Sequence, residues 1–159
     1  MCWKPCRRGM TGIIINAMRA DIPNLLHDIF GFSAFRGVQE AVVDRVMAGQ
    51  PALAIMPTGA GKSLCYQLPA MALDGCCVVV SPLIALMHDQ LRAAKAVGIR
   101  AASLTSVDTD WRETQDRLRA GELDLLYVAP ERASTEGFRS LLRSGTLSLF
   151  AIDEAHCVS

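Results

Sequence analysis

Short runs of apolar residues recur along the chain at nearly even spacing. They cover residues 52–56, 77–81, 101–104, 124–128 and 148–152, about 24 residues apart. Between the runs, apolar residues follow the spacing of helices. Strands that alternate with helices predict βαβ units and a parallel sheet, and continuous apolar runs fit strands covered by helices on both faces. The pattern therefore predicts an α/β fold with a parallel sheet flanked by helices.

Turn and cap residues predict where the helices begin and end. Apolar positions predict one helix over residues 22–30 and a second from Val38 to Gly49. Ser81 is expected to cap a helix over residues 83–97, with Pro82 at its first position. The remaining predicted helices cover residues 64–73, residues 110–120 with a capping box of Asp110 and Glu113, and a short stretch opened by Pro130.

A glycine-rich turn, Met56-Pro57-Thr58-Gly59-Ala60-Gly61-Lys62-Ser63, lies between the first apolar run and the helix from Leu64. A strand, such a turn and a helix that begins at Lys-Ser form the usual cradle for nucleotide phosphates. Lys62 is expected to reach the β- and γ-phosphates, and the Ser63 hydroxyl to bind Mg²⁺. The motif usually begins with glycine, and Met56 occupies that place. A chance Gly-Lys-Ser turn is the alternative.

Two carboxylates follow the last apolar run directly. Asp153 and Glu154 come after Ile152, far downstream of the glycine turn. In phosphate-binding enzymes such a pair supplies a residue that holds the metal and a residue that activates water. Asp153 is therefore predicted to hold Mg²⁺ opposite Ser63, and Glu154 to be the general base. A charged turn at a strand end is the alternative for this pair alone.

Composition narrows the class of protein. With 159 residues and 51% hydrophobic content, the chain is expected to be one soluble globular domain. Sixteen basic and sixteen acidic residues balance, so no overall charge indicates a nucleic-acid partner. The six cysteines are predicted to be small, buried, reduced side chains. No apolar run approaches the roughly 18 residues of a membrane span, and export is not expected. Residues 1–20 are predicted to be a disordered leader, or to follow from a start codon assigned too early.

The motifs taken together resemble the RecQ subfamily of superfamily 2 helicases. Residues 57–63 look like motif I, and Asp153-Glu154-Ala155-His156 looks like the DEAH form of motif II. That family often lacks the first glycine, which fits Met56. Four further segments carry the resemblance: Phe30 to Gln39 (motif 0), Leu64-Cys65-Tyr66-Gln67, Val80 to Gln90 (motif Ia), and Tyr127 to Arg132.

This resemblance implies a P-loop NTPase (RecA-like) fold and roles for individual residues. Residues 21–159 would be the N-terminal portion of the first ATP-binding domain of a 3′–5′ DNA helicase that acts in recombination and repair. The implied cofactors are ATP and Mg²⁺, with Lys62, Asp153 and Glu154 in catalysis. Nucleotide contacts are expected from Phe32, Arg36, Gln39, Thr58, Gly59, Ala60, Gly61, Lys62 and Ser63. Weaker candidates for contacts with the backbone of single-stranded DNA are Ser81, Pro82, Thr105 and Arg132.

The resemblance also implies parts that the sequence does not contain. It ends at Ser159, before the aromatic-rich loop, motif III and the second domain with its arginine finger, so the fold is expected to be incomplete at its C-terminus. The motif III strand of this family lies between the strands of motifs I and II. The chain alone is expected to bind nucleotide without unwinding DNA. The alternatives are a nucleotide-binding module without catalysis and a fragment of an RNA helicase. The expected location is the nucleoid in a bacterium or the nucleus in a eukaryote.

Overall fold

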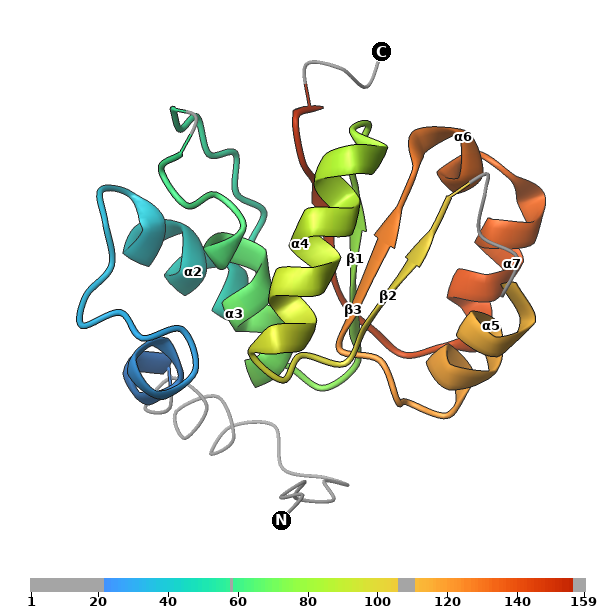
Figure 1. Ribbon diagram of the computed structural model, residues 1–159, viewed down its shortest axis with the longest axis horizontal. Helices are drawn as coiled ribbons and strands as arrows, with labels where there is room; N and C mark the ends of the chain where they lie inside the picture. The colour runs from blue at the N-terminus through green and yellow to red at the C-terminus, as the bar shows by residue number, and fades with distance from the viewer. Residues whose placement is uncertain (1–21, 58, 106–110, 156–159) are drawn as a thin grey trace.

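Four strands form one parallel sheet in the computed structural model, which describes residues 22–57, 59–105 and 111–155. The strands are β1 (Cys76–Val80), β2 (Ala101–Leu104), β3 (Leu125–Val128) and β4 (Leu147–Ile152). Their order across the sheet is β2-β3-β1-β4, and all three pairings are parallel. Figure 1 shows β2, β3 and β1 side by side. The predicted α/β class with a parallel sheet is confirmed.

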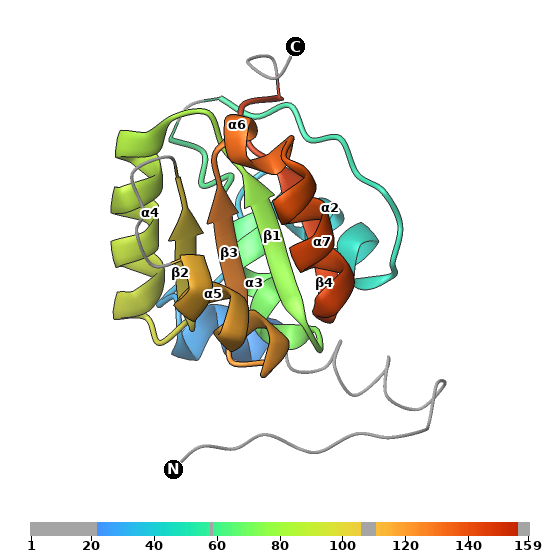
Figure 2. The same cartoon turned by 90° about the vertical axis from the view of Figure 1, so that its right-hand side faces the viewer.

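Helices cover both faces of the sheet (Figures 1 and 2). They are α2 (Gln39–Met47), α3 (Leu64–Ala72), α4 (Ile84–Ala96), α5 (Trp111–Arg119), α6 (Pro130–Ala133) and α7 (Glu136–Ser144), and residues 22–28 are also helical. Cys77 and Val79 of β1 pack with α3 and α4, whereas Cys76 and Val78 pack with α5 and α7. This alternation follows from the two-residue period of a strand.

The predicted boundaries are right to within one or two residues for four strands and most helices. Strand β2 has its predicted bounds, and Pro130 is the first residue of α6. The predicted cap at Ser81 is wrong. Helix α4 begins at Ile84 with Leu83 at the cap position, and no side chain caps it. Asp110, the first half of the predicted capping box, lies outside the described residues.

The predicted strand over residues 52–56 is wrong. This segment has no regular secondary structure and pairs with no strand among the described residues, and Leu53 and Ile55 are 86% and 90% exposed. A strand is stable only when its N–H and C=O groups find a neighbouring strand. Strand β4 forms that edge of the sheet, and its outer side makes no ladder with residues 52–56. An apolar run is therefore not sufficient for a strand when its partner is missing.

Two predictions from composition can be followed into the structure. Cys65, Cys76 and Cys77 are buried free thiols, as predicted, whereas the other three cysteines lie outside the described residues. In the part of the chain that the structure describes, no helix has both the length and the apolar character needed to cross a bilayer.

Candidate functional site

The glycine turn leads from the apolar segment before it into α3 at the carboxyl edge of the sheet, where Asp153 and Glu154 also lie. Gly59 and Gly61 have φ of +80° and +74°, a left-handed conformation that glycine adopts without steric cost. A Cβ at Gly61 would also stand 2.7 Å from Nε2 of Gln39. Both constraints favour glycine at position 61. Thr58 lies outside the described residues.

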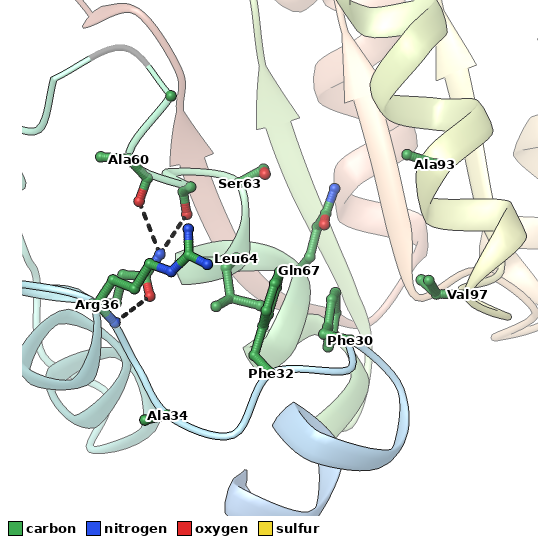
Figure 3. A pocket seen from close by; sticks show the side chains of 13 residues that line it. Phe30, Phe32, Ala34, Arg36, Ala60, Ser63, Leu64, Gln67, Ala93 and Val97 are labelled. Atoms are coloured by element: carbon green, nitrogen blue, oxygen red, sulfur yellow. Dashed lines mark hydrogen bonds between the residues drawn. The ribbon is translucent and has the colours of Figure 1, made fainter.

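Gln39 fastens this turn to the start of α2. Its Nε2 donates to the carbonyl oxygens of Ala60 and Gly61 at 3.0 and 3.1 Å, and its Oε1 accepts from the backbone N–H of Arg36 at 2.8 Å (Figure 3). The side chain is buried, with 3% of its surface exposed. The carboxamide that was expected to contact the nucleotide is therefore engaged within the chain, and a base would have to replace these bonds.

A pocket of about 370 Å³ opens beside the turn. Its lining includes Phe30, Phe32, Arg36, Gly59, Ala60, Gly61, Ser63 and Gln67, with Ala93 and Val97 from α4 (Figure 3). This volume and its largely apolar lining are typical of small-molecule sites. The Arg36 guanidinium lies 5.6 Å from the centre of the Phe32 ring. A flat base between them requires about 7 Å, twice a carbon contact distance, so this slot must widen slightly.

Lys62 and Glu154 form an ion pair, with Nζ 2.8 Å from Oε1. The two residues are 92 positions apart in the sequence, yet both were predicted for one site. The hydrogen bond to Glu154 raises the pKa of Lys62 above its ordinary value, so Lys62 is cationic at neutral pH. Glu154 has φ of +50°, which is unusual for a residue with a side chain and is often found at functional sites.

Asp153 and Ser63 offer the oxygen ligands that Mg²⁺ prefers. Asp153 is buried and its Oδ1 accepts from the backbone N–H of Glu154 at 3.0 Å. The Ser63 hydroxyl lines the pocket and makes no hydrogen bond among the described residues. Within those residues no cluster of three or more His, Cys, Asp or Glu side chains could cage a metal. One carboxylate and one hydroxyl fit Mg²⁺, which usually binds with phosphates and water as its other ligands.

The predicted DNA contacts lie along the same carboxyl edge, but two of them are inside the protein. Ser81 and Thr105 are fully buried. Arg132 stacks over the Trp111 ring at 5.3 Å and donates to the carbonyl of Thr105 at 3.3 Å. The exposed apolar residues here are Leu83 and Leu86 at the start of α4. The role of these residues toward DNA stays a prediction.

The sequence did not predict a polar bridge beside the pocket, which consists of two hydrogen-bonded pairs of side chains, Gln67 with Tyr127 and Tyr66 with Gln90. Gln67 donates to the Tyr127 hydroxyl at 3.0 Å, and Tyr66 donates to Oε1 of Gln90 on α4 at 2.9 Å. Burial raises the pKa of both phenols. A signal was present, because a glutamine in the middle of the apolar α3 is expected to have a buried partner.

Comparison with known proteins gives consistent matches. A family model described as DEAD/DEAH box helicase matches residues 36–159. The chain is 46% identical over 138 residues to the ATP-dependent DNA helicase RecQ of Pasteurella multocida, covering 86% of this chain and 22% of that protein. Identity to the ATP-dependent DNA helicase RecQ of Bacillus subtilis is 42% over 139 residues, which cover 86% of this chain and 24% of that protein. The ATP-dependent DNA helicase Q-like 2 of Arabidopsis thaliana is 45% identical over 150 residues, which cover 89% of this chain and 21% of that protein. The chain thus spans about a fifth of the length of these relatives.

Proposed function

The chain belongs to the DEAD/DEAH box helicase family, and we propose that it is the ATP-binding part of an ATP-dependent DNA helicase of RecQ type. The contact between Lys62 and Glu154 carries this proposal, because it brings the glycine turn and the carboxylate pair into one site. The similarity to helicases from two bacteria and a plant supports the RecQ type.

In the proposed reaction the glycine turn and the start of α3 bind the phosphates of ATP through backbone N–H groups. Lys62 exchanges Glu154 for oxygens of the β- and γ-phosphates. Glu154 is then free to accept a proton from the water that attacks the γ-phosphate. Asp153 and Ser63 would hold Mg²⁺, which supplies positive charge to the phosphates. As long as Lys62 engages Glu154, the chain is not arranged for hydrolysis.

The base would enter the pocket between Phe32 and Arg36. Its ring stacks on Phe32, and the guanidinium lies over the other face. Gln39 would exchange the turn carbonyls for the edge of adenine, since a carboxamide both donates and accepts. We propose that nucleotide binding thereby loosens the bond between Gln39 and the glycine turn.

In the intact protein, the carboxyl edge near Pro82 and the start of α4 would follow a single DNA strand. Because Ser81 and Thr105 are buried, we propose that backbone N–H groups at the start of α4 contact the phosphates first. Contacts of this kind are independent of base sequence, as a motor that moves 3′ to 5′ along DNA requires. Recombination and repair are the proposed processes.

Titration of the 159-residue chain with a fluorescent ATP analogue tests the proposal. Lys62→Ala is expected to weaken binding about 10- to 100-fold, because a hydrogen bond to a charged group contributes roughly 1.5–3 kcal/mol. Lys95→Ala, which removes an exposed lysine of α4, is the matched control and should bind like the parent. Equal affinity of the Lys62→Ala chain and its parent would count against the proposal.

Glu154→Gln separates catalysis from mere binding. In a longer protein that contains this region, this variant is expected to bind ATP and to lose hydrolysis and strand separation, since it keeps the shape of the side chain but not the base. A module that only holds nucleotide would show unchanged strand separation. The ATPase rate and the unwinding of a labelled duplex are the two measurements.

A further inference from the structure

The hydroxyl of Ser81 is buried, and no described residue pairs with it. The residue follows β1, has 0% of its surface exposed, and its Oγ makes no hydrogen bond within the part of the chain that the structure describes. Its backbone N–H donates to the carbonyl of Val128 at 3.1 Å, so the backbone is satisfied while the side chain is not. An unpaired buried hydroxyl destabilises a fold, which raises the question of what it pairs with when the site is occupied.

The register of the sheet identifies the polar neighbour of Ser81. Val80 pairs with Val128 on one side and with Ile152 on the other, so Ser81 stands in a row between Ala129 and Asp153. Ala129 has no polar side-chain atom. The backbone N–H of Asp153 donates to the carbonyl of Val80 at 2.8 Å, which holds the two strand ends together.

Ser81 and Asp153 also share a face of the sheet. Val79 and Ala151 both pack on the side of α3 and α4, and Ser81 and Asp153 follow two positions later, each one residue past the end of its strand. The two-residue period of a strand, continued by that one residue, places both side chains on the same face. Neighbouring strands lie about 5 Å apart, so rotation about χ1 can bring the serine hydroxyl within hydrogen-bond distance of the carboxylate.

The carboxylate of Asp153 can accept a further hydrogen bond from Ser81. Its Oδ1 accepts from the N–H of Glu154, and in the described part of the chain no side chain donates to its carboxylate. Carboxylates that bind a metal are usually oriented by a further hydrogen bond from the protein.

We propose that Ser81 is a positioning residue for Asp153, and that its hydroxyl donates to the carboxylate when Asp153 binds the Mg²⁺ of Mg-ATP. The inference rests on the proposed function, because it takes Asp153 as the metal ligand. It assigns Ser81 a role inside the nucleotide site, in place of the direct DNA contact that its motif implied. The bond forms in the Mg²⁺-bound state, so its energy contributes to Mg²⁺ affinity and not to the fold.

The test compares ATP binding in Mg²⁺ with ATP binding in EDTA for the parent chain and for Ser81→Ala. The variant is expected to bind Mg-ATP about tenfold more weakly, the lower end of the usual loss when a metal ligand loses its partner. Its affinity in EDTA should equal that of the parent. Its melting temperature should be equal or higher, because the hydroxyl it loses has no partner in the fold.

Ser148→Ala is the matched control. Ser148 is the other buried hydroxyl without a partner among the described residues, and it lies in β4 at the register shift opposite Cys76 and Cys77, five residues before Asp153. It should change the melting temperature in the same direction and leave both affinities unchanged. Adding Ser81→Ala to Asp153→Asn should cause no further loss, because the residue it positions is already gone.

The outcomes are separable. If the parent binds ATP more tightly in Mg²⁺ and Ser81→Ala keeps that difference, the inference is wrong and the proposed function stands. If Ser81→Ala weakens binding equally in Mg²⁺ and in EDTA, the serine affects the pocket as a whole and the inference is also wrong. If the parent binds no nucleotide in either condition, the proposed function fails and the inference fails with it.

Discussion

Strands β1 and β4 are neighbours in the same sheet and are both apolar, but they differ in burial. All five residues of β1 are buried. In β4, Phe150 and Ile152 are each 51% exposed. Strand β1 has a paired strand on each side and helices over both faces, whereas β4 pairs on one side only. The comparison shows that two similar apolar runs can both form strands, while their neighbours decide how deeply each strand is buried.

The largest expected effect of this difference comes from placing a charge in each strand. Val78→Asp in β1 should cost roughly 4 kcal/mol or more and unfold the chain, because a carboxylate without a partner is buried between helices and sheet. Phe150→Asp in β4 should change the free energy of unfolding by about 1 kcal/mol or less, because the new carboxylate reaches water. Urea unfolding followed by circular dichroism measures both. Comparable losses would contradict the proposed difference between the strands.

A smaller effect is expected at Gln39, whose side chain connects the start of α2 to the glycine turn. Gln39→Ala removes three hydrogen bonds and leaves the carbonyls of Ala60 and Gly61 without their donor, at a cost of about 2 kcal/mol. Gln50→Ala, at an exposed position just beyond α2, is the control and should cost less than about 0.5 kcal/mol. Hydrogen exchange should also become faster at residues 59–63. Unchanged exchange would show that Gln39 does not hold the turn.

The smallest expected effect is a gradual loss of stability at alkaline pH, which originates on the covered face of the sheet. Tyr66 and Tyr127 are the two tyrosines of the chain, and burial raises the pKa of both. The unfolded chain therefore loses phenolic protons first. The free energy of unfolding should be at its full value below about pH 10 and fall as the pH rises further.

Tyrosinate absorbance should then appear together with the loss of secondary structure. Ionisation of either phenol near pH 10 in a chain that is still folded would show that the polar bridge of Tyr66 and Tyr127 is open to solvent.

The ion pair of Lys62 also loses its contribution to stability as the pH rises. Its pKa is raised in the folded chain, so the contribution is complete below about pH 10.5 and is lost above the folded-state pKa. The Lys62→Met variant separates this contribution from that of the phenols.

Local patterns predicted much of the fold and the proximity of Lys62 to Glu154. The bounds of β2 follow from four apolar or small residues between a helix and a turn. Lys62 and Glu154 were assigned to one site although the sequence separates them, because a glycine-rich phosphate turn and a downstream carboxylate pair serve one site in phosphate-binding enzymes. These predictions depend on short-range spacing and on motifs that recur in such enzymes.

The failures involve partners that a local pattern does not contain. Residues 52–56 have the composition of a strand, but pairing depends on a neighbour elsewhere in space. Ser81 is a residue type typical of helix caps, but its hydroxyl is buried and α4 begins three residues later, at Ile84. Gln39, which was expected to contact the nucleotide, lines the pocket and also bonds to the glycine turn, a contact that the sequence did not predict. In each case the contacts are set by tertiary packing.

The position of β1 between β3 and β4 has a consequence for synthesis on the ribosome. Strand β1 is made first, yet both of its partners in the sheet are made later, and Leu125 of β3 follows Val80 by about 45 residues. At 5–20 residues per second, β1 waits roughly 2–10 s for its first neighbour. During that interval an apolar segment of five residues is exposed on the nascent chain. Strand β1, all of whose residues are buried in the finished sheet, is therefore an early candidate for chaperone binding during translation.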